Sequence, residues 1–400
     1  MKILILCGVF SDVNTKEILE KATAPVEFSA NNMQQKLIKG FESSECELSV
    51  ISAPFIGTFP TSSKIINFKG FKEPCNEYKY VKFNNVWGIR NFSRAKALIK
   101  AMDSFINDGD PDKAIIIYHA HTPFIKAGVY AKEKDPNIKL CLYVTDLPQY
   151  MNLSADRGFI YNMAKTIDNV TMTKLMKKVD AFVLLTEQMK EKLPVDDKLY
   201  MIVEGIIDDI PEIEDYQYDD GLKYVVYTGK LYEEFGVKNL IDSFRYIDNS
   251  DYRLILCGTG DCYDYALKAK EKDNRICPLG QVNPEEAIKW QKKATVLVNP
   301  RNNNSEYTKY SFPSKNIEYL LTGKPVIGYM LDGMPEIYKS FINVLEPDSD
   351  EGASMANKII DVVSVAKGEV REENLQYLEY ARNMISASVI AQRIIRLLES

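Results

Sequence analysis

Short apolar runs alternate with longer amphipathic segments along most of the chain. In the first half the apolar runs are Lys2–Cys7, Glu47–Ser52, Ala114–Tyr118, Lys139–Val144 and Ala181–Leu185. Helical spacing of apolar residues occupies Asn32–Glu42 and Ser93–Ile106, whereas Phe68–Val86 is irregular and is expected to form an insertion or an extra hairpin. Buried parallel strands are continuously apolar, and the helices that connect them repeat every 3.6 residues. The alternation therefore predicts βα units and a parallel sheet.

A second series of the same kind follows an acidic segment, Glu204–Gly221, which is expected to be a linker. Its predicted strands are Lys223–Thr228, Tyr252–Cys257, Arg275–Pro278, Ala294–Asn299 and Pro325–Tyr329. Its predicted helices are Val237–Tyr246, Tyr263–Lys272, Pro284–Lys292, Ser314–Thr322 and the tail Glu372–Leu398. We expect an α/β protein with two Rossmann-like domains, 1–205 and 222–375, that face a central cleft. Ligands of such sheets bind beyond the carboxyl ends of the strands.

Composition narrows the class of protein. A chain of 400 residues with 46% hydrophobic and 26% charged residues suits two soluble domains. The net charge of -6 argues against nucleic acid as the main partner. Seven scattered cysteines without a CxxC pair indicate reduced thiols and a cytoplasmic location. The apolar start is too short for a signal peptide, and no stretch is long enough to span a bilayer, so attachment to a membrane surface is the most that is expected.

The segment Ser311–Gly328 carries the clearest candidate chemistry. Pro313 suits the first turn of a helix and Gly323 its end, so the first-turn amides are free to hold an anion. Lys315 and Glu318 lie on one face of this helix. A cation, free N–H groups and a carboxylate are what a diphosphate and a ribose require. The alternative is a solvated ion pair on a surface helix.

Three other strand ends in the second half fit the same site. Arg301 ends a buried strand and opens a long polar loop, where it is placed to clamp phosphate oxygens, although an ordinary surface arginine explains it equally well. Gly229-Lys230 and Gly258-Thr259-Gly260 follow consecutive strands. Glycine there lets the backbone approach a ligand, and a tight turn is the alternative.

In the first half, His119 and His121 are the only histidines and end an apolar strand. As i and i+2 residues of a strand they would share one face, but no cysteine or carboxylate accompanies them, so a metal site is disfavoured. A hydrogen bond from His121 to a sugar or acceptor hydroxyl is preferred. Asp146 follows the next strand and is expected either at this site or at a helix cap. Gly8 ends the first strand and leaves room for a ligand or for the turn.

These residues resemble a known family. Gly229-Lys230-Leu231, Gly258-Thr259-Gly260, Gly280-Gln281-Val282 and Ser311–Gly328 look like the retaining glycosyltransferases of family four, which have the GT-B fold. His121-Thr122-Pro123 matches as well. The resemblance implies a nucleotide-sugar donor on the second domain, the acceptor on the first, and a final helix, about 380–400, that packs back on the first domain. It implies no metal and no cofactor other than the donor substrate.

Two departures from the family pattern shape the expected site. Glu318 matches the ribose-binding Glu that ends the E-x7-E motif, but Tyr310 stands where the first Glu belongs. Lys230 keeps the first basic residue of the G-[RK]-L…K-G segment, but Phe235 replaces the second. Arg301 and Lys315 are expected to supply the missing positive charge.

The site residues predicted from these arguments fall into three groups. The catalytic group is Arg301, Lys315 and His121; the donor-binding group is Gly229, Lys230, Gly258, Gly260, Tyr310, Ser311, Ser314 and Glu318; the acceptor-binding group is Gly8, His119 and Asp146. The resemblance implies attack on the same face of the sugar, with the leaving phosphate taking the acceptor's proton. No pair of protein carboxylates is then required, in contrast to glycosidases.

The expected function is metal-independent, retaining transfer of a sugar to a glycan or lipid-linked acceptor in surface polysaccharide or glycoconjugate synthesis. The alternatives are a non-catalytic GT-B partner protein, which Tyr310 favours, and a nucleotide-sugar epimerase. Two basic helical segments are candidates for contact with anionic lipid on the inner face of the plasma membrane, or else form solvated faces. They contain Arg90, Arg94, Lys96 and Lys100 in the first case and Lys174, Lys177 and Lys178 in the second.

Overall fold

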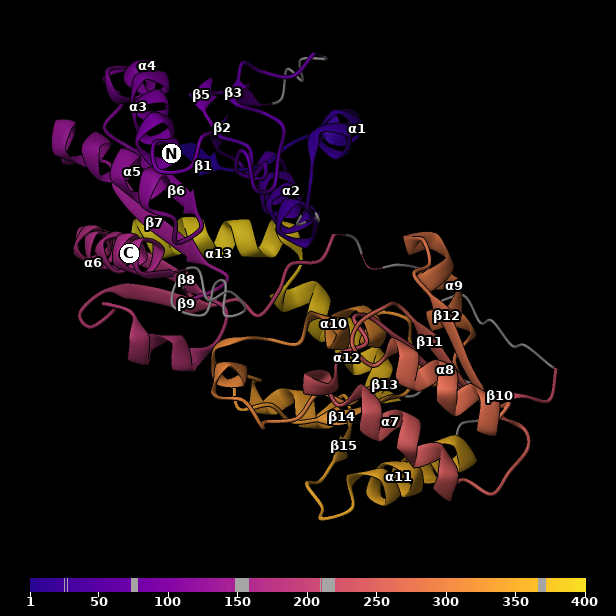
Figure 1. Cartoon of the computed structure of the whole chain (residues 1–400). Coiled ribbons are helices and arrows are strands. Elements are labelled where there is room, and N and C mark those ends of the chain that lie inside the picture. Colours follow the sequence, from indigo (N-terminus) through magenta and orange to yellow (C-terminus); the bar gives the residue numbers. More distant parts are fainter. Residues whose placement is uncertain are drawn as a thin grey trace. The chain divides into compact units, whose positions relative to one another are not determined.

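The computed structural model describes residues 1–24, 26, 28–72, 78–147, 158–208, 210, 220–365 and 372–400. The chain forms two compact domains (Figure 1). The first consists of Met1–Asp208 together with Met384–Ser400, and the second consists of Asp209–Asn383. Most of the acidic segment 204–221 and Cys75 lie outside the described residues, and a cleft between the domains stays a prediction.

The first domain is built on a seven-stranded sheet in the order β4-β2-β1-β6-β7-β8-β9. All neighbouring strands pair in parallel. The strands are β1 (Lys2–Cys7), β2 (Glu47–Ser52), β4 (Lys79–Tyr80), β6 (Lys113–Tyr118), β7 (Lys139–Val144), β8 (Ala181–Leu184) and β9 (Leu199–Ile202). A separate antiparallel pair, β3 (Asn67–Phe68) and β5 (Phe83–Asn84), forms the predicted insertion.

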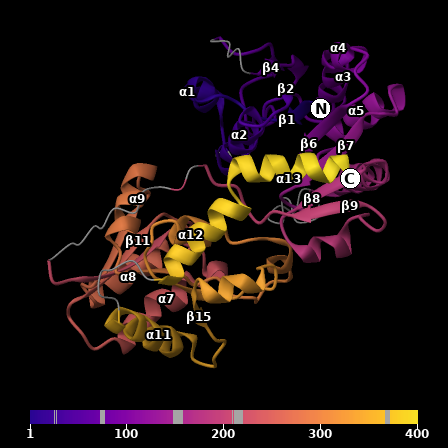
Figure 2. The same cartoon turned by 180° about the vertical axis from the view of Figure 1, so that it is seen from behind.

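Helices connect these strands and one more arrives from the end of the chain. They are α1 (Asp12–Lys21), α2 (Phe28–Glu42), α3 (Arg90–Ala101), α4 (Asp103–Ile106), α5 (Thr122–Lys134), α6 (Gly158–Met176), the 3₁₀ helix η1 (Glu187–Lys192) and α13 (Ala387–Glu399). Figure 2 shows α13 lying along the first domain beside β8 and β9. Its buried face is Ile390, Ile394 and Leu398. At Gly40 of α2 a Cβ would lie 2.1 Å from the carbonyl oxygen of Ala387, so α2 and α13 meet where α2 has no side chain.

The second domain has a six-stranded parallel sheet in the order β12-β11-β10-β13-β14-β15. The strands are β10 (Lys223–Thr228), β11 (Tyr252–Cys257), β12 (Ile276–Gly280), β13 (Val296–Asn299), β14 (Val326–Tyr329) and β15 (Asn343–Leu345). The helices are α7 (Val237–Ser243), α8 (Tyr263–Lys272), α9 (Pro284–Lys293), α10 (Ser314–Leu320), α11 (Glu351–Val365) and α12 (Glu372–Met384), with 3₁₀ helices η2 (Glu233–Phe235), η3 (Phe244–Tyr246), η4 (Glu306–Tyr310) and η5 (Glu336–Ser340). In the described part of the chain, no helix has both the length and the apolar content that crossing a membrane requires.

Two predicted helices are each divided in the structure. Ser93–Ile106 becomes α3 and α4, which are separated at Met102. The tail becomes α12 and α13, because the backbone at Ser386 is extended (φ -66°, ψ 145°). There Ile207 donates to the carbonyl of Ile385 and accepts from the amide of Ala387, both at 2.9 Å. These backbone bonds to the first domain replace helical ones, which explains why apolar spacing alone did not reveal the break.

Both sheets reverse their strand order at one point. In the first domain β2 and β4 lie on one side of β1, and β6 to β9 lie on the other. In the second domain β11 and β12 lie on one side of β10, and β13 to β15 on the other. The carboxyl ends of strands beside such a reversal are where open parallel sheets bind ligands. Two pairs of strand ends, β1 with β6 and β10 with β13, are therefore the places to look for a site.

Candidate functional site

At the reversal in the second domain, the loops that follow β10 and β13 touch. Gly236, with φ 75°, closes the loop after β10. A Cβ at Gly236 would lie 2.1 Å from the carbonyl oxygen of Pro300, which directly follows β13. Only glycine tolerates both this backbone conformation and this contact. The two loops, and with them Lys230 and Arg301, thus belong to one edge of the sheet.

Arg301 is held between two aromatic rings at this edge. Its guanidinium carbon lies 4.9 Å from the ring centroid of Tyr307 and 5.5 Å from that of Phe235. Its Nη2 donates to Ser311 Oγ at 2.9 Å. Its Nε is buried and has no hydrogen-bond partner among the described residues. A guanidinium that is held between two rings and has an unused N–H donor is suited to binding an anion, because the side chain loses little further freedom on binding.

Helix α10 is anchored to the same strand ends by its buried face. Tyr319 Oη accepts from the amide of Thr228 at 2.8 Å, at the end of β10. Asn316 Oδ1 accepts from Asn299 Nδ2 at 2.7 Å, at the end of β13. Lys315 and Glu318 lie on the opposite, more exposed face and form an ion pair of 2.6 Å between Nζ and Oε2. Neither anchor was predicted, although both follow from the helical period once Lys315 and Glu318 are assigned to the outer face.

Lys315 also lies near the end of β11. Burial and the negative charge of Glu286 raise the pKa of the Cys257 thiol to about 11, and the positive charge of Lys315 opposes both effects. Because Cys257 ends β11, the first turn of α10 lies close to that strand as well as to β10. Ser314, the first residue of α10, is exposed, and no side chain caps this helix. The structure thus brings Arg301, Lys315, Glu318, Ser311 and Ser314 to one sheet edge.

The predicted glycines are explained by packing between two loops. Gly258 has φ 141°, and a Cβ there would lie 1.8 Å from the carbonyl oxygen of Gly229. A Cβ at Gly260 would lie 2.3 Å from that of Leu231. The amide of Leu231 donates to the carbonyl of Thr259 at 2.9 Å, which joins the loops directly. Close backbone contact is thus a sufficient reason for Gly258 and Gly260, and their direct contact with a donor stays a prediction.

Tyr310 and Lys230 differ sharply in exposure. Tyr310, which stands where the resemblance expects a glutamate, is only 4% exposed. Lys230 is exposed, and the hydroxyl of Tyr227 bonds its carbonyl oxygen at 2.9 Å. Lys230 is therefore the more accessible of the two predicted donor contacts.

At the reversal of strand order in the first domain, the ring of Phe55 packs against Gly8. A Cβ at Gly8 would lie 2.3 Å from the ring of Phe55, and the Gly8 amide donates to Gln34 Oε1 at 2.7 Å. The Phe55 ring meets those of His119 and His121 edge to face, at centroid distances of 5.6 and 6.2 Å. The structure thus brings Gly8 and both histidines together around Phe55, a residue that no sequence pattern identified.

The two histidines lie beyond β6, which ends at Tyr118, and not within a strand as predicted. Their rings are nonetheless parallel, with centroids 6.3 Å apart and an interplanar angle of 4°. Both Nδ1 atoms are buried and have no hydrogen-bond partner among the described residues. Burial lowers the pKa of His119 to about 4 and lowers that of His121 well below its ordinary value, with the charge of Arg94 adding to the second effect. Both imidazoles are therefore neutral at physiological pH.

Arg94 belongs to the interior and not to an exposed basic face. It is 1% exposed, its Nη2 donates to the carbonyl of Pro54 at 2.6 Å, and its guanidinium carbon lies 4.5 Å from the Phe83 ring centroid. The predicted lipid-binding face of α3 is wrong in this residue, because helical spacing turns position 94 toward the core. Burial also lowers the pKa of Arg90.

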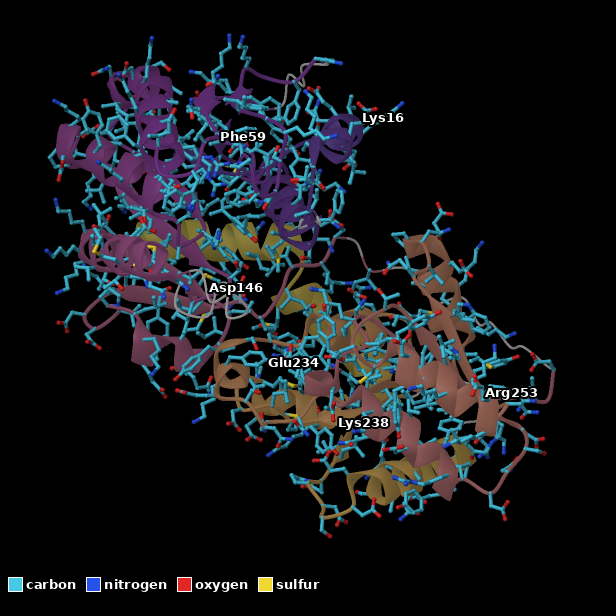
Figure 3. The ribbon with its side chains drawn as sticks, in the orientation of Figure 1. Lys16, Phe59, Asp146, Glu234, Lys238 and Arg253 are labelled. Carbon is cyan, nitrogen blue, oxygen red and sulfur yellow. The ribbon has the colours of Figure 1, made fainter. Side chains whose placement is uncertain are left out.

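Asp146 follows β7 and is exposed (Figure 3). Its Oδ2 accepts from Thr145 Oγ1 at 3.3 Å. A cap on a helix directly after it would fall on residues 148–157, outside the described part of the chain. Among the residues that the structure does describe, no three His, Cys, Asp or Glu side chains are grouped as metal ligands would be.

Comparisons with known proteins agree with this architecture. Residues 222–364 match the family described as glycosyl transferases group 1. The solved structure of the lipopolysaccharide outer core galactosyltransferase WaaB, in its apo form, is similar over 100% of this chain and 99% of that one, with a TM-score of 0.63 and 13% identity. HepE of Anabaena in complex with UDP is similar over the whole of both chains, with a TM-score of 0.61 and 13% identity. No curated protein sequence matches the chain. The fold is GT-B, with two Rossmann-like domains built on parallel sheets.

Proposed function

We propose that this chain is a retaining, metal-independent glycosyltransferase that takes a sugar from a nucleotide-sugar on its second domain. The acceptor, a glycan or a lipid-linked glycan, binds at the strand ends of the first domain. The match of residues 222–364 to glycosyl transferases group 1 supports sugar transfer, and the strand-order reversals support the two places of binding.

The observation that carries the proposal is the position of Arg301. Phe235 stands where the resemblance to family four expects a second basic residue, and the Arg301 guanidinium lies 5.5 Å from the Phe235 ring centroid. Arg301 therefore places a positive charge beside the position that has lost one. Its unpartnered Nε and its bond to Ser311 give it a fixed orientation and a donor to spare.

The chemistry assigned to these residues is stabilisation of charge on the leaving diphosphate. The bond between the sugar's anomeric carbon and the phosphate oxygen breaks, and a bond to the acceptor oxygen forms on the same face. The acceptor's proton passes to the departing phosphate. Arg301, Lys315 and Lys230 offset the growing negative charge, and Glu318 accepts hydrogen bonds from the ribose hydroxyls.

His121 and its neighbours act on the sugar and the acceptor in this proposal. The neutral imidazole is able to donate or accept a hydrogen bond at physiological pH, and its buried Nδ1 has no partner among the described side chains. His119, Gly8 and Asp146 bind the acceptor. We place the reaction in the cytoplasm, in polysaccharide or glycoconjugate synthesis, since the described cysteines are all free thiols.

Calorimetric titration with a panel of UDP-, GDP- and ADP-sugars tests donor binding. UDP-glucose and UDP-galactose come first, because HepE has been solved with UDP-glucose and WaaB is a galactosyltransferase. We expect Arg301→Gln to weaken binding of the bare nucleoside diphosphate by roughly tenfold or more. Arg245→Gln is the matched control, since Arg245 is an exposed arginine of the same domain that pairs with Asp242 at 3.6 Å.

Other outcomes separate the alternatives. If no nucleotide-sugar binds, the transferase proposal fails. Binding without release of nucleotide in the presence of any glycan acceptor favours a non-catalytic partner protein, which the tyrosine at position 310 would suit. Net epimerisation of the sugar without an acceptor favours an epimerase.

A further inference from the structure

Four large apolar side chains are exposed near one end of the first domain. They are Ile66, Trp87, Ile89 and Phe92, which are 47%, 50%, 51% and 68% exposed, and we name them the Trp87 patch. The amide of Asn85 donates to the carbonyl of Ile66 at 2.7 Å, which joins the two segments that carry the patch. Figure 1 shows the elements involved, β3, β5 and α3, close together at this end of the domain. Grouped exposure of large apolar side chains usually marks an interaction surface.

The backbone beneath the patch is well anchored. The amide of Trp87 donates to the carbonyl of Phe59 at 3.3 Å, and Phe59 is labelled in Figure 3. Asn85 is buried, and its Nδ2 donates to the carbonyls of Gly57 and Ile65 at 2.7 and 3.0 Å. Arg90 bonds the hydroxyl of Thr58 from the first turn of α3. The apolar side chains are therefore held outward by an ordered scaffold that has its own hydrogen bonds.

Charge in the described segments that carry the patch is of one sign, whereas Glu73 and Glu77 lie between these segments, at positions that the structure does not describe. The described segments 53–72 and 78–101 contain no Asp or Glu, although the whole chain has a net charge of -6. Their exposed lysines are Lys64, Lys69, Lys72, Lys79, Lys82, Lys96 and Lys100. Within the described residues, none of these seven forms an ion pair within 4.0 Å. Lys79 Nζ donates to the carbonyl of Ala101 at 2.8 Å, and the Glu17 carboxylate accepts from the amide of Lys72 at 3.0 Å. The charges available to an external anionic surface are therefore those of Lys64, Lys69, Lys82, Lys96 and Lys100.

We propose that the Trp87 patch docks this protein on an anionic lipid bilayer. Trp87, Phe92 and the two isoleucines enter the boundary between headgroups and acyl chains, and the surrounding lysines lie against lipid phosphates. A second copy of the chain is a poorer occupant, because the same lysines would then face each other. The proposal deepens the proposed function by bringing the acceptor-binding domain to the surface where a lipid-linked acceptor resides.

The other predicted lipid-binding segment is less suitable. Helix α6 exposes Met163, Ile167 and Val170, but Asp168 lies among them. Lys178, just beyond that helix, is paired with Glu133 at 2.5 Å. Part of the positive charge of this segment is therefore already neutralised within the protein, and the structure favours the Trp87 patch as the lipid-binding surface.

Fluorescence of Trp87 tests the docking directly. The chain has two tryptophans, so Trp290→Phe leaves Trp87 as the only one. We expect its emission to shift to shorter wavelength with phosphatidylglycerol-containing vesicles and to stay unchanged with pure phosphatidylcholine. High salt should reverse the shift, since the lysines act through charge. An unchanged spectrum with anionic vesicles at low salt would overturn the proposal.

Vesicle flotation tests which residues are responsible. Trp87→Ser with Phe92→Ser should lower the partition coefficient by roughly tenfold or more, and Lys82→Gln with Lys96→Gln should lower it several-fold. The matched control is Ile288→Ser with Leu267→Ser, which removes two exposed apolar side chains of the second domain, 49% and 39% exposed. Equal binding by the Trp87/Phe92 variant contradicts the proposal, as does a dimer in light scattering that this variant abolishes. Donor binding by this variant should equal that of the wild type, which separates failure of docking from failure of the proposed function.

Discussion

The hydroxyl of Tyr319 accepts a hydrogen bond from the backbone amide of Thr228 at 2.8 Å, and both residues are buried. This bond joins the last turn of α10 to the last residue of β10. The exposed face of α10, with Lys315 and Glu318, is thereby oriented by a contact on its hidden side.

Replacing Tyr319 by Phe should therefore destabilise the second domain. The Thr228 amide would be left buried without its acceptor, which costs roughly 1–3 kcal/mol of unfolding free energy. Urea unfolding followed by Trp290 fluorescence in a Trp87→Phe background measures this. Tyr265→Phe is the control, because Tyr265 is 37% exposed and its hydroxyl bonds Asp242 at the surface. Equal stability of Tyr319→Phe and wild type would show that the bond does not hold α10 in place.

A comparison of Gly258 with Gly221 distinguishes two reasons why a position requires glycine, backbone conformation and close packing. Both have positive φ, 141° and 72°, but a Cβ meets the Gly229 carbonyl oxygen at 1.8 Å in the first case and nothing within 4 Å in the second. Gly221→Ala should cost about 1 kcal/mol, from backbone strain alone. Gly258→Ala should cost more than about 3 kcal/mol or prevent folding of the domain, since two backbones must also separate. Similar unfolding free energies for the two variants would remove the packing explanation.

Lys315→Ala distinguishes a binding role from a structural one. The ion pair with Glu318 is partly exposed, so its loss should change the unfolding free energy by less than about 1 kcal/mol. Binding of a bare nucleoside diphosphate should nevertheless weaken by roughly tenfold, because a cation near the phosphates is lost. Lys339→Ala, which breaks a comparable surface pair with Glu336, should leave binding unchanged. If Lys315→Ala binds like that control, Lys315 does not contact the donor.

His119 makes the stability of the first domain depend on pH. Its pKa falls from 6.5 to about 4 on burial, so as pH decreases the unfolded chain takes up a proton before the folded one does. The folded state therefore loses stability as pH falls from 6.5 to about 4, and the loss then levels off. Calorimetry across this range should show wild type losing roughly 1–3 kcal/mol more than His119→Asn. If both proteins show the same pH dependence, burial does not lower the pKa of His119 in the folded state.

The sheets were predictable because burial on both faces leaves a continuous apolar run. Lys2–Cys7, Glu47–Ser52 and Lys139–Val144 begin and end in the structure where the sequence pattern places them. The residues at the strand ends were also found, since Arg301 comes two positions after β13 and His121 three positions after β6. Helix α5, whose first turn contains Pro123, was missed because most of its first nine residues are buried, and its polar face is narrow and contains Lys126 and Glu133.

What the pattern could not provide is the partner of each side chain. Arg94 looks like its exposed neighbours in α3, and only the position of Phe83 and the Pro54 carbonyl shows that it is buried. Phe55 follows β2 without any motif, yet it contacts both histidines. Such contacts depend on how distant segments pack, and a single sequence carries no signal for them.

The position of α13 has a consequence for synthesis of the protein. The helix contacts α2, β8 and β9 of the first domain, but it is translated after all of Asp209–Asn383. During translation β8 and β9 therefore lack the covering helix α13 until the whole second domain has emerged from the ribosome. The second domain is able to fold first, and the first domain becomes complete only when Ile390, Ile394 and Leu398 have left the exit tunnel.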